Sequence, residues 1–212
     1  MRRRTSTGLV AALVATLLQG CRSADPDPTV LVRTVNGVEL GVSTDHGVVF
    51  LGRTATSGDA ELVTWFGDGP SIEPGLIEDM GGDLYTLDVA VRIPTVEIDF
   101  DPKAPGTELT IRGRGFDGVW ERTTTVADGV PASGLVLEPP VEPLPSECSG
   151  AGVFARDRDG DLRLVGMLVG RALVETPSGT RDVVCAISGM DLWRVVTYDR
   201  NRHRKPNTPA RP

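Results

Sequence analysis

The sequence of 212 residues is poor in the residues that build metal and cofactor sites. It has two histidines, His46 and His203, and three cysteines, none of which forms a CxxC pair. A zinc site is therefore not expected, because zinc sites need clustered histidine and cysteine ligands. The acidic run over 157–161 is expected to be a strand connection and not a calcium loop, since an EF-hand would need glutamate where this chain has Leu168. No metal site is predicted. The chain also has no glycine-rich phosphate loop and no dinucleotide-binding fingerprint, so no cofactor is expected.

Positive charge is scarce as well. Residues 1–20 hold three of the 22 lysines and arginines, which leaves 19 basic against 29 acidic residues and a formal charge of −10 on the rest of the chain. A strongly acidic protein is repelled by phosphate backbones, which argues against nucleic acid as a partner. The basic, proline-containing end of the chain, residues 201–212, is predicted to be a disordered, solvated tail.

Long apolar runs are missing except at the start. Three arginines precede an apolar stretch over residues 8–18, which is typical of a signal peptide and too short to span a membrane. The signal peptide is predicted to cover residues 1–20. Its end, Leu18-Gln19-Gly20-Cys21, resembles a bacterial lipobox, and this resemblance implies a lipid on Cys21 followed by a linker over 21–29. We therefore expect an exported protein anchored by lipid at the bacterial cell envelope, in the periplasm or at the outer membrane; plain secretion is the alternative.

The remaining residues, about 190, are enough for one domain with a core of its own. Turns rich in Gly, Pro and Asp divide them into short strand-like segments, which predicts an all-β fold. The expected strands cover 29–35, 38–43, 47–54, 61–66, 84–93, 108–115, 118–126, 133–139, 151–156, 162–170 and 182–187. One helix is predicted to begin near Ser188, its N-cap, with Leu192, Val195 and Val196 on one face.

The stretch Glu147–Phe154, ECSGAGVF, places a serine in a tight glycine-containing turn before an apolar strand. Acyl-transfer nucleophiles are presented in this way. The stretch resembles the nucleophile region of trypsin-like serine proteases, and residues 30–200 resemble them in the order of their segments. This resemblance implies two six-stranded antiparallel β-barrels closed by a C-terminal helix, with Ser149 in the nucleophile position. The alternative is an ordinary turn whose serine caps its own backbone.

The resemblance also places the other members of a catalytic triad. Asp88 opens the segment DVAVRIP and takes the position of the orienting acid. His46 precedes Asp88 at an acceptable separation for the base. However, the first barrel resembles bacterial periplasmic proteases of the high-temperature-requirement type, and counting back from Asp68-Gly69 in that comparison places Thr54 in the base position. We favour Thr54, which cannot act as a base at neutral pH.

A second departure concerns the oxyanion hole, the pair of backbone N–H groups at Ser149 and two residues before it. Active relatives have glycine at the earlier position, whereas this chain has Glu147, whose charge opposes a developing oxyanion. Cys148 and Cys185 form an even pair in a compartment where disulfides persist, and they are the disulfide candidate.

The sequence therefore predicts a catalytically impaired trypsin-like serine protease homologue that keeps its inter-barrel cleft to bind a protein or peptide. An active serine endopeptidase with the triad His46, Asp88 and Ser149 is the first alternative. A non-enzymatic β-sandwich lipoprotein is the second. The distance between His46 and Ser149 separates the first two hypotheses, and the presence of barrels tests the third.

Overall fold

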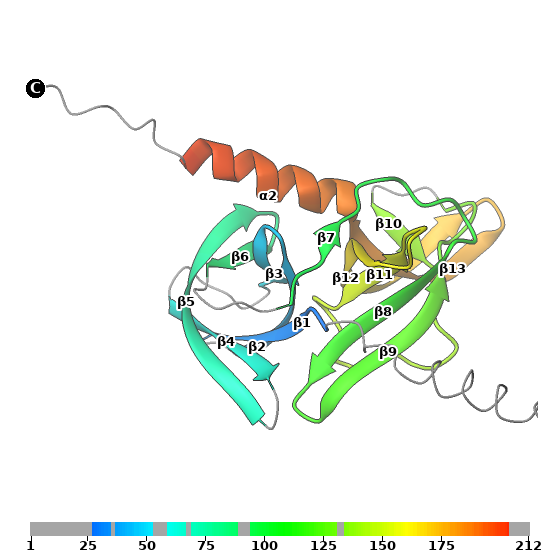
Figure 1. Cartoon of the computed structure of the whole chain (residues 1–212). Helices are drawn as coiled ribbons and strands as arrows, with labels where there is room; N and C mark the ends of the chain where they lie inside the picture. The colour runs from blue at the N-terminus through cyan, green and yellow to red at the C-terminus, as the bar shows by residue number, and fades with distance from the viewer. Residues whose placement is uncertain are drawn as a thin grey trace, which may run out of the picture.

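A computed structural model describes residues 27–34, 37–52, 59–66, 69–88, 94–130 and 134–203 (Figure 1). The elements are β1 Thr29–Thr34, β2 Gly37–Thr44, β3 Gly47–Leu51, β4 Asp59–Phe66, β5 Gly69–Gly81, β6 Leu84–Asp88, β7 Glu97–Ile98, β8 Glu108–Gly115, β9 Gly118–Thr125, β10 Leu135–Leu137, β11 Gly152–Arg156, β12 Leu162–Thr176, β13 Gly179–Ser188 and α2 Gly189–His203. The predicted all-β body with a C-terminal helix is confirmed. The proposed signal peptide and Cys21 lie outside the described residues.

The first six strands close into an antiparallel barrel in the order β1-β2-β3-β6-β5-β4. Successive residues of a strand face opposite sides, so Val48 and Phe50 of β3 fill the barrel while Val49 and Leu51 face outward. Val30, Val32, Ala60, Leu62 and Leu87 complete the interior. The first predicted barrel is therefore confirmed, and the β-sandwich alternative is wrong.

The second half forms a seven-stranded sheet and not the closed six-stranded barrel that was predicted. Its order is β10-β13-β12-β11-β8-β9, and β7 adds to β12 in parallel. The edges β9 and β10 meet only at the bridge between Val126 and Leu137, flanked by two backbone hydrogen bonds. Because β10 has three residues and is followed by Pro139-Pro140, it is too short to build a ladder with β9.

Strand β5 is the element that the sequence pattern missed. Pro70 and Pro74 disfavoured a strand, since proline cannot donate to a ladder. In the structure both prolines pair only with β4, and the contact of β5 with β6 begins later, at Leu76. The prolines thus lie where β5 has a single neighbour.

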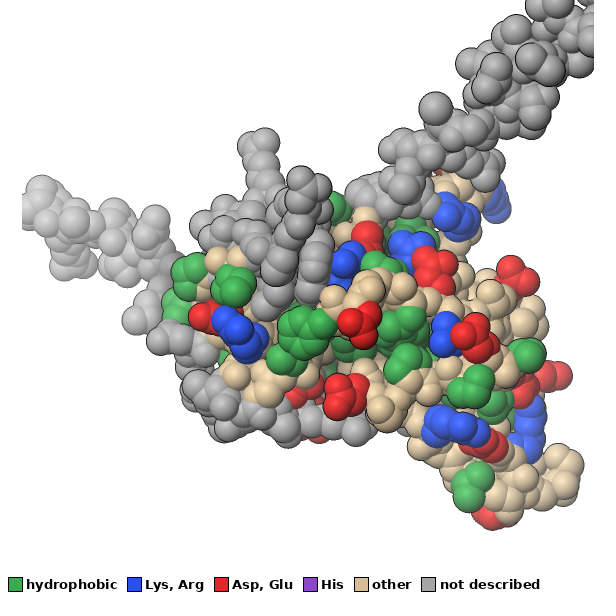
Figure 2. Space-filling view, turned by 90° about the horizontal axis from the view of Figure 1, so that it is seen from below, with side chains coloured by type: hydrophobic (Ala, Val, Ile, Leu, Met, Phe, Trp, Pro, Cys, Tyr) green, Lys and Arg blue, Asp and Glu red, His purple; other side chains and the backbone are tan. Residues whose placement is uncertain are grey.

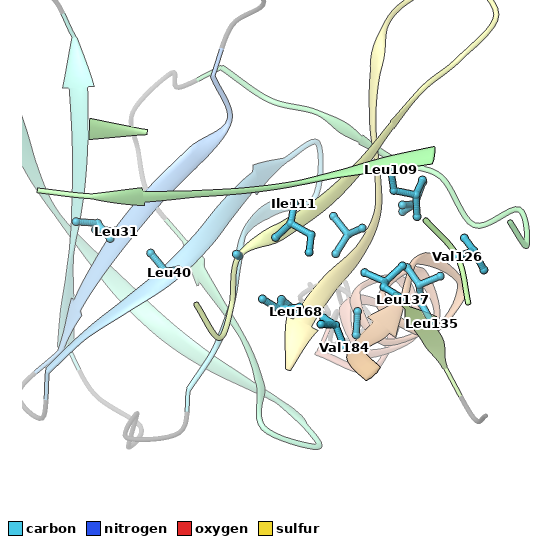
Figure 3. Packing of buried hydrophobic residues seen from close by; sticks show 13 residues of the cluster. Leu31, Leu40, Leu109, Ile111, Val126, Leu135, Leu137, Leu168 and Val184 are labelled. Carbon is cyan, nitrogen blue, oxygen red and sulfur yellow. The ribbon is translucent and has the colours of Figure 1, made fainter. Parts of the chain in front are cut away.

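Two further clusters join the halves. Leu31 and Leu40 of the first barrel pack with the core of the second sheet, which includes Ile111, Leu168 and Val184 (Figure 3). The two halves therefore share a core along β1 and β2.

The second joining cluster lies between the two halves and beneath α2, which runs over both of them in Figure 1. Leu192 and Val196 of α2 are buried there, and Val195 packs beside them. Ser188 Oγ accepts the N–H of Asp191 at 3.2 Å, so the predicted helix and its cap are confirmed. The helix continues to His203, three residues into the segment that was predicted as a tail. No helix in the described part of the chain is long and apolar enough to cross a membrane.

Candidate functional site

Ser149 is the second residue of a β-turn over Cys148–Ala151. The N–H of Ala151 donates to the carbonyl of Cys148 at 3.1 Å, and Gly150, the third residue, has a φ of 87°. This is the conformation that a type II turn requires of its third residue, which explains the glycine. The N–H of Gly150 donates to the carbonyl of Leu168, and the N–H of Leu168 donates to Ala151, both at 2.8 Å. The turn is thus fixed to β12.

The turn also packs against β2 of the first barrel. A Cβ atom at Gly150 would lie 2.4 Å from the carbonyl oxygen of Leu40, and one at Gly152 would lie 2.9 Å from Cγ2 of Val42. From residue 150 to 152 the chain therefore runs beside β2 in the same direction as β2. Ser149 accordingly lies where the two halves meet, at the level of Leu40.

A proline-rich segment leads into this turn, and the structure confirms that it is a loop held along β9. Arg122 Nε donates to the carbonyl of Pro143 at 3.0 Å, and its Nη2 pairs with Glu142 at 2.9 Å. Thr124 Oγ1 donates to the carbonyl of Glu138 at 2.5 Å. These bonds fix the approach to the Ser149 turn from one side.

The hydroxyl of Ser149 is buried, and Oγ has no hydrogen-bond partner among the described residues. A buried hydroxyl without a partner costs about 1–3 kcal/mol of stability. A serine nucleophile instead bonds to a neighbouring base that takes its proton. Among the described residues, none forms the hydrogen bond to Ser149 Oγ that would activate it as a nucleophile.

His46 lies in the two-residue turn between β2 and β3, as the alignment with Thr54 predicts. Its N–H donates to Thr44 Oγ1 at 3.1 Å, and its Nε2 lies 3.5 Å from the carboxylate of the adjacent Asp45. Since β-strands rise about 3.3 Å per residue, Thr44 is roughly 13 Å along β2 from Leu40, where the Ser149 turn packs. His46 is therefore at the far end of β2 from Ser149.

Asp88 is the last described residue of β6, and the segment DVAVRIP that it begins lies mostly outside the described residues. Val48 of β3 pairs with Leu87, so Asp88 lies at the His46 end of the barrel. Position alone is described for Asp88; its side chain is outside the described atoms. The structure thus places Asp88 and His46 at one end of the barrel and Ser149 at the other.

The sequence reasoning did not consider Asp83, which strand register places beside the end of β3. Leu51 pairs with Leu84, and the N–H of Gly52 donates to the carbonyl of Asp83 at 3.0 Å. Leu51 in turn is level with Leu40, since Gly41 pairs with Phe50. The carboxylate of Asp83 is exposed, unlike a buried orienting acid.

Thr54 lies outside the described residues. The last described residue before it is Gly52, directly after β3 ends at Leu51. Glu147, in the predicted oxyanion position, is described and exposed, two residues before Ser149. The predicted effect of Glu147 on the oxyanion position remains a prediction.

No disulfide joins Cys148 and Cys185 in the region that the structure describes, so the predicted bridge is not formed. Cys148 packs against the core cluster that contains Val184 and Ala186. Cys185 lies between these two residues on β13, and strand alternation directs its side chain to the opposite face of the sheet. The two thiols therefore face opposite sides.

The aspartate-rich turn over 157–161 connects β11 and β12 and is held together by hydrogen bonds to the carboxylate of Asp157. The carboxylate of Asp157 accepts the N–H groups of Asp159 and Asp161, both at 2.9 Å, and Arg163 Nε at 2.8 Å. The bond from Arg163 is the main cause that lowers the pKa of Asp157. These carboxylate contacts explain the motif as a strand connection, and no cluster of metal-binding side chains occurs among the described residues.

Comparisons with known proteins define the class of fold. No protein-family model matches the chain, and no curated protein matches its sequence. Solved structures match over most of its length. The MamO protease domain from Magnetospirillum magneticum, in its apo form, is 18% identical, covering 81% of this chain and 96% of its own, with a TM-score of 0.55.

Two further structures agree. The Rv3671c protease of M. tuberculosis in its inactive form is 15% identical over 87% of this chain and 94% of its own, with a TM-score of 0.61. Deg5 is 14% identical over 90% and 95%, with a TM-score of 0.54. The chain has the fold of trypsin-like serine protease domains. At these identities the likeness concerns the fold alone.

Proposed function

We propose that this chain is a catalytically impaired homologue of trypsin-like serine proteases, held by a lipid on Cys21 at the bacterial cell envelope. It keeps the surface around the Ser149 turn as a binding site for a protein or peptide. The observation that carries the proposal is the buried Ser149 Oγ without a hydrogen-bond partner in the described part of the chain. The histidine that would activate it, His46, belongs to the opposite end of β2.

The size of the catalytic deficit supports this proposal. Loss of the base from a serine triad costs about 10⁶ in turnover, which equals about 8 kcal/mol of transition-state stabilisation. Loss of an oxyanion donor costs about 3–4 kcal/mol more. Glu147 adds negative charge at that donor position. A well-placed Ser149 offsets neither effect.

The strand register supports Thr54 as the residue in the base position. Position 54 follows Gly52 by two residues, and Gly52 bonds to Asp83 at the end of the barrel where Ser149 lies. A threonine hydroxyl has no proton-accepting capacity at neutral pH that compares with imidazole. On this placement the triad positions hold Ser149, Thr54 and an exposed Asp83.

The retained function is recognition. The Ser149 turn bonds to Leu168, and the next residue, Val169, is about a third exposed, so an apolar side chain is presented to solvent beside the turn. The strand is irregular at this point, with a register shift between Leu168 and Gly170. Bulges of this kind redirect side chains next to sites. The exposed Glu147 on the other side of the turn adds a charge that favours a partner with a basic group.

The first test is labelling of the soluble form that begins at residue 22 with a fluorophosphonate probe for activated serines. We expect no incorporation into the wild type or into Ser149→Ala, with circular dichroism showing that both are folded. Probe incorporation that disappears in Ser149→Ala would contradict the proposal and support the active alternative with His46, Asp88 and Ser149. A His46→Ala variant would then show whether His46 is the base.

The anchor has its own test. Cells that express the full chain are fed a labelled fatty acid, and the protein is isolated from membranes. We expect label in the wild type and none in Cys21→Ser, whereas Cys148→Ser keeps it. Equal labelling of the wild type and Cys21→Ser would rule out lipid attachment at Cys21.

A further inference from the structure

The chain enters the fold beside the hairpin that joins β8 and β9. The carboxylate of Asp27 forms an ion pair with Arg114, and Arg114 Nε donates to the carbonyl of Thr29 at 3.1 Å. Both groups of the ion pair are largely buried. Arg114 is the second-last residue of β8, so the start of the described chain is fixed near the tip of this hairpin.

The proposed lipid anchor is close to this point in the sequence. Cys21 precedes Asp27 by six residues, and a fully extended chain of that length spans at most about 20 Å. Asp27 therefore stays within this distance of Cys21, and Arg114 lies directly beside Asp27. A tether this short favours an orientation in which the side of the domain near Arg114 faces the bilayer.

The hairpin tip on that side exposes apolar side chains. Its turn consists of Phe116 and Asp117; Phe116 is 70% exposed, and Val119, which pairs with Arg114 across the hairpin, is 43% exposed. The hairpin extends to the lower edge of Figure 1. Figure 2 views the molecule from that side and shows hydrophobic side chains gathered among acidic and basic ones. A tip with an exposed aromatic ring suits the boundary between headgroups and acyl chains.

We propose that the tip of the β8–β9 hairpin, with Phe116 at its end, inserts into the surface of the bilayer that holds the lipid anchor. This inference rests on the proposed lipid on Cys21. The contact is apolar and not electrostatic, because both nearby charges are negative: Asp117 shares the turn, and the chain after residue 20 has a formal charge of −10. Neither charge is attracted to anionic lipids. The contact orients the domain so that the Ser149 turn keeps a fixed position relative to the membrane.

The experiment uses fluorescence of a tryptophan introduced at the tip. The lipidated full protein is placed in phosphatidylcholine vesicles whose acyl chains are brominated or unmodified. We expect the emission added by Phe116→Trp to be quenched by brominated chains, and the emission added by Leu173→Trp to be unaffected. Leu173 is the matched control, because it is 75% exposed on a different hairpin. We also expect Phe116→Ser to weaken vesicle binding about tenfold, with little dependence on salt.

A second arm separates this proposal from the lipid anchor. The form that begins at residue 22 carries an N-terminal histidine tag and is tethered to vesicles with nickel-chelating lipids, which replaces the acyl chains at nearly the same position. Quenching of Phe116→Trp in this arm supports the contact even if Cys21 proves to carry no lipid. Equal quenching, or none, for Phe116→Trp and Leu173→Trp in both arms would overturn it. A dimer in solution that Phe116→Ser converts to monomer, without quenching, would assign the tip to protein contact and overturn it as well.

Discussion

The Cα of Gly150 lies so close to the carbonyl oxygen of Leu40 that a methyl group at residue 150 would come within 2.4 Å of that oxygen. This contact between the turn that holds Ser149 and a strand of the first barrel fixes the site where the two halves meet. It is a contact between backbones, so rotation of a side chain cannot relieve a substitution there.

Gly150→Ala is therefore expected to lower the free energy of unfolding by about 2–4 kcal/mol, from the strain of a positive φ and the displacement of Leu40. Gly106→Ala is the matched control. Gly106 has a φ of 78° against 87° for Gly150, and nothing lies within 4 Å of its added Cβ. The control is expected to lose about 1 kcal/mol. Urea unfolding measures both, and equal losses would mean that the turn moves away from β2 without cost.

Ser149→Ala is expected to leave the stability unchanged or to raise it by up to about 1 kcal/mol, because it removes a buried hydroxyl without a partner in the described structure. Thr124→Val is the comparison, since its hydroxyl donates to Glu138 at 2.5 Å. It is expected to lose about 1–2 kcal/mol. Thermal unfolding of the two variants and the wild type measures these changes in stability. A clear loss of stability in Ser149→Ala would reveal a bonding partner for Oγ.

Ser188→Ala is expected to lower the free energy of unfolding by about 1 kcal/mol through loss of the cap of α2. The hydroxyl of Ser188 both accepts the N–H of Asp191 and donates to its carboxylate at 2.6 Å. Ser178→Ala, in the exposed turn between β12 and β13, is expected to change stability by less than about 0.5 kcal/mol. Calorimetry on the two variants gives the comparison; indistinguishable melting temperatures would show that the cap contributes nothing.

Two titratable thiols are expected in the soluble form that begins at residue 22. Cys148 and Cys185 face opposite sides of the sheet, so air oxidation without denaturant is not expected to join them. A thiol reagent added in urea without reductant should count two groups per chain. A count of zero, restored to two by reductant, would show that the pair forms a disulfide after all.

Acid is expected to weaken the turn that Asp157 organises. Its pKa is lowered in the folded state, chiefly by the bond from Arg163, below the value of about 3.9 for the unfolded chain. The stabilisation is therefore present above about pH 4 and is lost as the pH falls through the folded pKa. Asp157→Asn should be less stable than the wild type at pH 7, and the difference should shrink below pH 4. Equal stability of Asp157→Asn and the wild type at pH 7 would show that the turn does not depend on this carboxylate.

Much of the fold could be predicted from local sequence patterns. Alternating apolar residues placed most strands, because one face of each strand is buried, and the Ser188 cap with Leu192 and Val196 placed the helix. Strand β5 was not predicted, because Pro70 and Pro74 argued against a strand. Both prolines lie where β5 pairs with a single strand, and this is known only once the whole sheet has formed. The gap between β9 and β10 is likewise a property of tertiary geometry.

The site was less accessible to sequence reasoning. An aspartate before an apolar run occurs at both Asp83 and Asp88, and the pattern does not choose between them. The pairing of Leu51 with Leu84 places Asp83 beside the end of β3, and this pairing depends on closure of the whole barrel. The position of His46 in a turn, by contrast, followed from its neighbours, because Asp45-His46 separates two apolar strands.

The helix that covers both halves has a consequence for the order in which the chain folds. The first barrel is built from residues 29–88 alone, so it is complete in sequence long before the chain ends. The cluster that joins it to the second sheet also needs Leu192 and Val196, which come far later in the sequence than residue 88. During synthesis the protein therefore passes through a stage in which the first barrel is complete but the cluster between the two halves has not yet formed.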